Sequence, residues 1–183
     1  MKHLITTLAL SSLALGSAQA ASWQAVVPEK SSITFSYKQM GVAMDGKFRK
    51  FSAQVGLDTA KLDKAKGSIE IDLASIDTGS SEADQEVVGK SWFNVAAHPK
   101  ASFVLKSLKS AGANQYEAIG QLTLKGQTRE LHAPLKLTPQ GQLSGSFVLK
   151  RADYGIGEGM WAKFDVVAND IQVNFSLTAQ LSH

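Results

Sequence analysis

Alternation of apolar and polar side chains is the feature of this sequence that most constrains its fold. Between residues 171 and 181 the odd positions are Ile, Val, Phe, Leu, Ala and Leu, and the even positions are all polar. A period of two over that length indicates a β-strand with one apolar face and one hydrated face. The same alternation recurs at 33–37, 69–73, 101–105, 116–124, 131–137 and 147–149. We therefore expect an antiparallel barrel or sandwich of about eight or nine strands.

Two segments depart from this regular pattern. The apolar alternation changes phase between Phe48, at an even position, and Phe51, at an odd one. One extra residue near Arg49-Lys50 would restore the pairing, so we predict a β-bulge there that helps to curve the sheet. Residues 80–89 are the exception to the strand pattern, because Ser80 can cap a helix that Gly89 can end. No linker, repeat or low-complexity stretch divides the chain. We expect one all-β domain with one short helical insert.

The first twenty residues have the pattern of a secretory signal peptide. Lys2 gives the segment a positively charged start, an apolar run follows from residue 4 to 15, and Ala18-Gln19-Ala20 provides the small residues of a cleavage site. The apolar run is shorter than the roughly 20 residues that a membrane-spanning helix needs. We expect cleavage after Ala20, so that residues 21–183 form a mature domain in the bacterial periplasm.

Composition excludes several kinds of chemistry. The chain has no Cys, so it has no disulfides, thiolate metal sites or cysteine nucleophiles. A formal net charge of +3 is too small to indicate nucleic-acid binding. Residues 41–47 have the spacing of a phosphate-binding loop, but they lead into a predicted strand and lack the hydroxyl that follows the lysine. No His has a ligand companion at metal-site spacing, and the glycine-x-serine-x-glycine elbow is missing. We expect no catalytic residues, metal or cofactor.

The interior of such a barrel would be apolar. The inward-facing positions are Phe, Ile, Leu, Val and Tyr, and no alternating face carries a buried charge. In a barrel of about eight strands these side chains either fill the core or leave room for one small ligand. The alternation leaves both possibilities open.

An ordered set of short motifs resembles the YceI-like family over nearly all of residues 21–181. The motifs are Ile76-Asp77-Thr78-Gly79 leading to Asp84, Trp92-Phe93-Asn94-Val95, His98-Pro99 before Ala101-Ser102-Phe103, residues 120–128, and Arg151-Ala152-Asp153-Tyr154-Gly155-Ile156. The family pattern usually has a basic residue before the helix Asp and a His soon after it. This chain has Ala83 and Gln85-Glu86 there, so it departs from the pattern at the helix.

The resemblance implies an eight-stranded, antiparallel, lipocalin-like barrel in the periplasm with an elongated apolar cavity. It implies a carrier for a long isoprenoid or other lipid, with no established catalysis, no nucleic acid and no stable membrane insertion; a homodimer stays open. The alternatives are an enzyme acting on a lipid or its headgroup, and a filled barrel that acts as a stress-related interaction module. The residues expected to line the cavity are Phe35, Tyr37, Ile69, Ile71, Phe103, Leu105, Tyr116, Leu122, Leu124, Phe147, Leu149, Val173 and Phe175.

A second group of residues is expected at the cavity mouth. Gly155, Gly157 and Gly159 indicate a mobile loop after residue 154, which we expect to cover the entrance together with the segment after the helix. Arg151 is the predicted contact for an anionic headgroup; the alternative is a structural ion pair with Asp153. The predicted mouth residues are Asp84, Trp92, Phe93, Arg151, Asp153 and Trp161.

Overall fold

The computed structural model describes residues 22–181, so the predicted signal peptide lies outside the described residues. Within residues 22–181, eleven strands form one antiparallel sheet with one α-helix, α1 (Ser81–Val87). The strands are β1 (Ser22–Val26), β2 (Ser32–Gln39), β3 (Val42–Phe48), β4 (Phe51–Asp58), β5 (Lys66–Asp72), β6 (Ile76–Asp77), β7 (Lys100–Gly112), β8 (Gln115–Leu124), β9 (Gln127–Leu137), β10 (Gln142–Lys150) and β11 (Asp170–Leu181). Five short 3-10 turns connect them: η1 (Pro28–Lys30), η2 (Leu62–Lys64), η3 (Leu73–Ser75), η4 (Arg151–Tyr154) and η5 (Gly159–Trp161).

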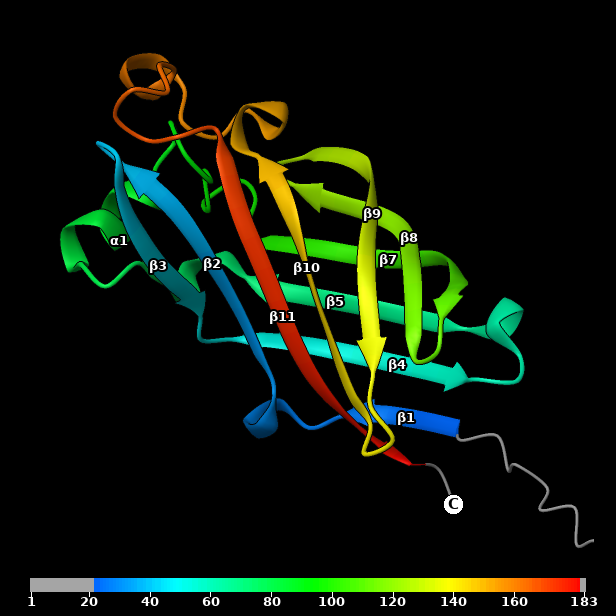
Figure 1. The fold of residues 1–183 in the computed structure, drawn as a ribbon. Coiled ribbons are helices and arrows are strands. Elements are labelled where there is room, and N and C mark those ends of the chain that lie inside the picture. The colour runs from blue at the N-terminus through cyan, green and yellow to red at the C-terminus, as the bar shows by residue number, and fades with distance from the viewer. Residues whose placement is uncertain (1–21, 182–183) are drawn as a thin grey trace, which may run out of the picture.

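The sheet closes into an eight-stranded barrel. Its strands follow the order β1-β4-β5-β7-β8-β9-β10-β11, and pairing of β11 with β1, as in Trp23 opposite Leu181, closes the ring. β2, β3 and β6 extend the sheet beyond β11 toward one end. Figure 1 shows the two faces of the barrel, with β10 and β11 crossing in front of β4, β5 and β7. The predicted barrel architecture is confirmed, and the sandwich alternative is wrong.

The first strands of the barrel are interrupted rather than continuous. One half of β11 pairs with β2 and its C-terminal part pairs with β1, so β1 and β2 act as two pieces of one edge. The bulge predicted near Arg49-Lys50 is instead a break between β3 and β4. Ser75 accepts hydrogen bonds there, through its carbonyl from Arg49 N–H (3.0 Å) and through its hydroxyl from Lys50 N–H (2.9 Å). The chain changes partner at this point, and so the apolar phase slips.

The predicted helix forms as α1, and its N-terminus is capped as expected. The Ser80 hydroxyl accepts from Ala83 N–H, and the helix ends at Val87, before Gly89. The helix, the β2–β3 turn and residues 151–169 lie at the same end of the barrel (Figure 1), which we name the α1 end. The opposite end, near β1, is the β1 end.

Two clusters of buried side chains lie toward the two ends of the barrel. The cluster at the β1 end is built around Trp23, which is almost completely buried, with Leu57, Leu137 and Leu177. The cluster at the α1 end contains Leu73, Trp92, Leu122, Leu124, Tyr154, Ile156 and Val167. Many inward-facing side chains between the two clusters are only half-buried. The interior is therefore hollow between its ends.

Candidate functional site: an elongated apolar cavity

The hollow interior consists of two adjoining compartments. The larger has a volume of about 490 Å³ and lies toward the α1 end, and the smaller has about 140 Å³ and lies toward the β1 end. The two compartments share wall residues, which are Ile33, Ile71, Ala101, Leu122, Phe147 and Val173. This shared wall is the waist of the cavity. The two compartments together give the barrel an elongated interior.

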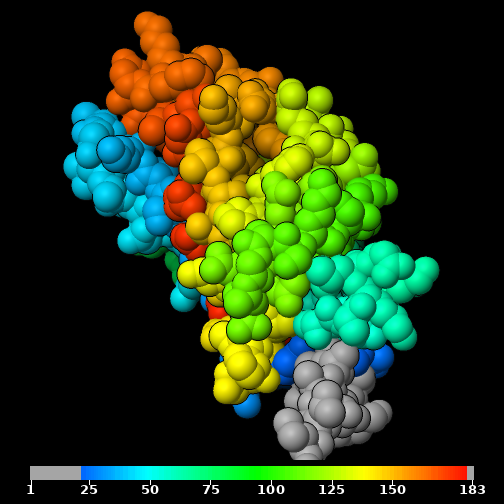
Figure 2. Space-filling model, turned by 45° about the vertical axis from the view of Figure 1, so that its right-hand side comes forward, coloured from blue at the N-terminus to red at the C-terminus, as the bar shows by residue number. Residues whose placement is uncertain are grey.

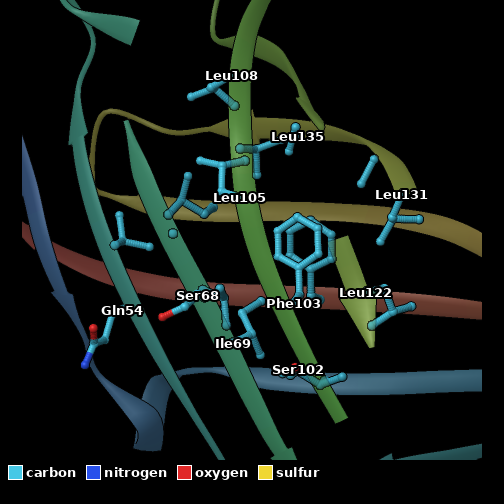
Figure 3. Close-up of a pocket in the computed structure, with 18 of the residues that line it drawn as sticks. Gln54, Ser68, Ile69, Ser102, Phe103, Leu105, Leu108, Leu122, Leu131 and Leu135 are labelled. Atoms are coloured by element: carbon cyan, nitrogen blue, oxygen red, sulfur yellow. The ribbon is translucent and has the colours of Figure 1, made fainter. Parts of the chain in front are cut away.

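The smaller compartment is almost entirely apolar. Figure 3 shows Ile69 from β5, Phe103 and Leu105 from β7, and Leu122 from β8 around a common space. These residues occupy alternate positions on their strands, so the pattern seen in the sequence places them on one face. Nothing in this compartment would hold a charged group in the barrel interior; Lys66 contributes to its edge and is exposed.

Three phenylalanine rings of the wall lie over glycines of neighbouring strands. Phe35 faces Gly46, and Phe175 faces Gly145, directly across antiparallel pairs. Phe103 lies over Gly120 diagonally, because the residue directly across from Gly120 is Leu105. A Cβ at any of these three glycines would collide with the phenylalanine ring over it. The missing side chains allow the rings to lie close against the sheet. The rings therefore form the cavity wall instead of filling its centre.

The structure places nearly all predicted lining residues on the cavity wall. Phe35, Tyr37, Leu124 and Leu149 line the larger compartment, and Phe103, Leu105, Ile69 and Phe175 line the smaller one. Ile71, Leu122, Phe147 and Val173 line both. Tyr116 is the exception, because it is buried in the cluster toward the β1 end. Alternation gives the face of a residue but not its depth along the barrel, and contact with a ligand stays a prediction for all of them.

Aromatic residues at the α1 end lie together as expected. Trp92, Phe93 and Trp161 line the larger compartment, and the ring centroids of Trp92 and Trp161 are 5.4 Å apart. Trp161 Nε1 donates to the Glu86 carboxylate at 2.9 Å. The backbone N–H groups of residues 157 and 158 both donate to Ser91 O at 2.8 Å. These hydrogen bonds join the segment after β10 to the segment after α1.

The two predicted acidic mouth residues do not line the cavity. One oxygen of Asp84 accepts from the N–H and the hydroxyl of Thr78, both at 2.7 Å, so this carboxylate fixes the turn that precedes α1. Asp153 is exposed, and its carbonyl accepts from Arg129 Nε at 2.7 Å. These contacts give both residues structural roles in the connections around the mouth.

Arg151 lines the larger compartment, but its donors already have partners in the chain, so contact with a headgroup stays a prediction. The side chain is 1% exposed, and all its N–H groups donate to backbone carbonyls. The acceptors, at 2.7–3.2 Å, are the carbonyl oxygens of Ile156, Gly157, Trp161, Lys163, Val167 and Ala168. No ion pair with Asp153 is present in the described part of the chain, so the alternative of a structural ion pair is wrong. Arg151 instead holds the segment after β10 in its wrapped path.

The glycines of this segment have a different role from the one expected. Gly155, Gly157 and Gly159 all have positive φ values, which L side chains rarely adopt. A Cβ on Gly157 would also collide with the Arg151 guanidinium. The glycines therefore allow the chain to wrap closely around Arg151.

Acidic side chains lie at the mouth of the larger compartment, a feature that was not predicted from the sequence. Glu82 and Glu86 are exposed and contribute to the lining, so the cavity reaches the surface between them. They are four residues apart on α1 and share a face, which is the sequence signal that could have revealed them. Hydrogen bonds from its own backbone N–H and from the hydroxyls of Ser80 and Ser81 lower the pKa of Glu82, so it stays ionised at neutral pH. The free charges at this mouth are negative.

Tyr37 adds a polar atom to the wall of the larger compartment. Burial, together with the negative charge of Asp84, raises the pKa of its hydroxyl, so it stays protonated at neutral pH. Gln39, Thr78 and Ser80 also contribute to this wall. Within residues 22–181, no three His, Cys, Asp or Glu side chains are grouped to hold a metal ion. No helix in that range is long and apolar enough to cross a membrane.

Comparison with known proteins identifies the family. The model of the YceI-like domain matches residues 24–179. The chain belongs to the YceI-like family. A UPF0312 protein of Azotobacter vinelandii is 28% identical over 169 residues, covering 85% of this chain and 88% of its own length. Another, from Yersinia pestis, is 36% identical over 110 residues, which cover 60% of this chain and 57% of that protein.

Solved structures of other proteins share the fold. BcnA of Burkholderia cenocepacia superposes with a TM-score of 0.81 at 35% identity, covering 83% of this chain and 98% of BcnA. A polyisoprenoid binding domain from Saccharophagus degradans superposes with a TM-score of 0.62 at 16% identity, covering 90% of this chain and 100% of that domain. These likenesses agree with a closed, antiparallel, eight-stranded barrel.

Proposed function

We propose that this protein is a periplasmic carrier that holds a long, uncharged polyisoprenoid lipid in its barrel. The observation that carries the proposal is the elongated apolar interior, with a compartment of about 490 Å³ continuing into one of about 140 Å³. The larger volume falls within the roughly 300–1,000 Å³ typical of ligand pockets. The predicted signal peptide supports the periplasmic location, and the structural relative that binds a polyisoprenoid supports the ligand class.

Binding would be driven by removal of the lipid chain from water. Each methylene buried contributes roughly 0.8 kcal/mol, offset by the cost of ordering the flexible chain. The walls supply few polar groups, so they select for length and width rather than for chemical detail. The waist formed by Phe147, Val173 and their neighbours is where a chain would pass from one compartment to the other.

The charges at the mouth of the larger compartment favour a lipid with an uncharged end group. Glu82 and Glu86 line the mouth, while Arg151 has its donors taken up by carbonyls and its guanidinium over the Trp92 ring. A phosphate would meet two carboxylates and no free cation among the lining residues of the larger compartment. The polar wall atoms of Tyr37 and Gln39 can hydrogen-bond a hydroxyl or carbonyl end group.

The test compares a long and a short prenol by equilibrium dialysis. Val173→Trp should block the waist, so it should weaken the binding of octaprenol and leave the binding of geraniol, which fits the larger compartment, unchanged. Asn174→Trp, on the neighbouring outward position, should change neither. Failure of octaprenol to bind the unmodified protein would overturn the carrier function.

Two further measurements use the same protein. Octaprenyl phosphate should bind more weakly than octaprenol, and equal or tighter binding would contradict the uncharged end group. Mass spectrometry of recovered octaprenol separates a carrier from an enzyme. Unchanged lipid supports the carrier, and a chemically altered lipid would favour the enzyme alternative. The filled-barrel alternative does not fit the hollow interior.

A further inference from the structure

Exposed apolar side chains gather at the α1 end of the barrel. Met160 is 84% exposed and Met40 is 76% exposed, and Val42 and Phe164 are exposed beside them in the sequence. We name these four side chains the apolar rim. They lie in two segments, the β2–β3 turn and the segment around η5. Exposed apolar groups that cluster in this way mark interaction surfaces.

Hydrogen bonds hold the two segments side by side. Met40 N–H donates to Val166 O at 2.7 Å, and Ala168 N–H donates to Lys38 O at 2.9 Å. An isolated bridge also pairs Gln39 with Val167. Figure 2 shows the two segments, coloured cyan and orange, next to each other at one end of the molecule. The apolar rim is therefore carried by a single fixed platform.

The apolar rim lies next to the larger compartment, on the outside of the molecule. Gln39 and Met44 flank the β2–β3 turn and line the larger compartment, and Trp161, which follows Met160, lines it too. None of the four rim side chains lines the cavity itself. The two other large apolar side chains that are exposed in the described residues, Val104 and Val148, lie on the wall strands β7 and β10.

We propose that the apolar rim docks on the surface of a lipid bilayer, so that the ligand moves between membrane and cavity without crossing bulk water. The proposal rests on the proposed function in one respect, namely that the ligand is a membrane lipid. A lipid surface fits this platform because its exposed apolar side chains project from two joined turns, next to residues that line the larger compartment. Lys38 and Lys163 are exposed in the same segments. The carboxylates there are Asp165 and Glu158, and Glu158 is paired with Lys125, so the two lysines offer cations at the headgroup level.

The absence of cysteine from the sequence makes a site-specific test direct. Met160→Cys and Val148→Cys each accept one environment-sensitive NBD fluorophore; position 148 is the matched control because Val148 is also exposed, at 54%. With vesicles of phosphatidylcholine and phosphatidylglycerol, NBD emission at position 160 should shift to the blue and rise several-fold. The emission at position 148 should not change. No response at position 160, or equal responses at both positions, would overturn the proposal.

The same label separates a membrane from a second copy of the chain. If the blue shift at position 160 follows protein concentration without vesicles, then the apolar rim is an interface between two copies and the docking proposal is wrong. The vesicle measurement uses protein without added ligand. It can therefore fail or succeed independently of octaprenol binding.

A transfer assay tests the consequence for the ligand. The double substitution of Met40→Ser with Met160→Ser should slow the uptake of a fluorescent prenol from vesicles several-fold and leave its equilibrium affinity in solution unchanged. Val104→Ser with Val148→Ser should change neither quantity. An unchanged uptake rate in the rim variant would contradict docking. Failure of the unmodified protein to bind the prenol at all would contradict only the proposed function.

Discussion

Arg151 shows how one side chain can determine the path of a whole segment. Its guanidinium donates to six carbonyl oxygens and lies over the rings of Trp92 and Phe164, at 5.4 and 5.1 Å from the ring centroids. Burial lowers the pKa of this group, but it remains charged at neutral pH. Arg151 lines the larger compartment itself, and it also holds in place the segment that carries Trp161.

Replacement of Arg151 should therefore reduce stability even when the charge is kept. Lysine lacks the planar fork of donors, so Arg151→Lys leaves several carbonyls unpaired, at a cost of about 1–3 kcal/mol each when they stay buried. We expect a clearly lower melting temperature in thermal denaturation. Arg129→Lys is the control, because Arg129 is exposed and its Nε donates to Asp153 O at the surface. Equal melting temperatures for the two variants would contradict the role assigned to Arg151.

The two faces of β11 should respond differently to a carboxylate. Phe175→Asp places a carboxylate on the apolar wall of the smaller compartment, whose one lining cation, Lys66, is exposed at the edge. We expect this buried, unpaired charge to lower the free energy of unfolding by several kcal/mol. Asn174→Asp lies on the alternate position and should be tolerated. The free energy of unfolding in urea distinguishes the two variants, and equal values would show that the faces are assigned wrongly.

His132 gives the outer surface a pH-dependent contact. Hydrogen bonds to the carboxylates of Glu130 and Glu117, both at 3.1 Å, raise the pKa of its imidazole. The raised folded-state pKa means that this contribution to stability is complete below the unfolded-state value of about 6.5 and is lost as pH rises through the folded value. An NMR titration should give Glu130→Gln an imidazole pKa lower than that of the unmodified protein. An unchanged pKa would contradict the assigned cause.

At the scale of elements, the strand glycines determine how close the wall rings come to the sheet. A Cβ at Gly120 would lie 2.5 Å from Val104 O, a backbone atom that cannot move away cheaply, and it would also push the Phe103 ring inward. Gly120→Ala should therefore lower both the melting temperature and the affinity for octaprenol. At Gly56, on β4, a Cβ would meet only Lys66 Cβ at 3.8 Å. Gly56→Ala should keep both values or gain about 0.4–1 kcal/mol of stability. Equal losses in both variants would contradict the ring-over-glycine account.

Local pattern was enough to predict most elements but not their interruptions. Alternation predicted the strand at 171–181, and a capping serine predicted α1, because each depends on neighbours in the chain. The break at Arg49-Lys50 depends on Ser75, which lies in another segment and supplies the hydrogen bonds there. The partners of Arg151 are carbonyls, which every residue type carries, so no side-chain pattern could reveal them.

At the scale of the whole molecule, the sequence could not decide between a filled and a hollow barrel. The alternation places Tyr116 and Phe103 on the same kind of inward face, yet one is buried in the cluster toward the β1 end and the other lines the cavity. The difference depends on position along a closed barrel and on the space that strand glycines provide. Glu82 and Glu86 belong to the mouth because the fold places α1 at this end of the barrel.

The central claim is that the cavity holds a long uncharged isoprenoid. Native mass spectrometry of the protein, purified without detergent from the periplasm of an expressing bacterium, tests it most directly. We predict a complex of one chain with one lipid, whose mass, after extraction into organic solvent, is that of an unphosphorylated polyisoprenoid. A spectrum that shows only the bare chain, before and after incubation with octaprenol, would contradict the claim.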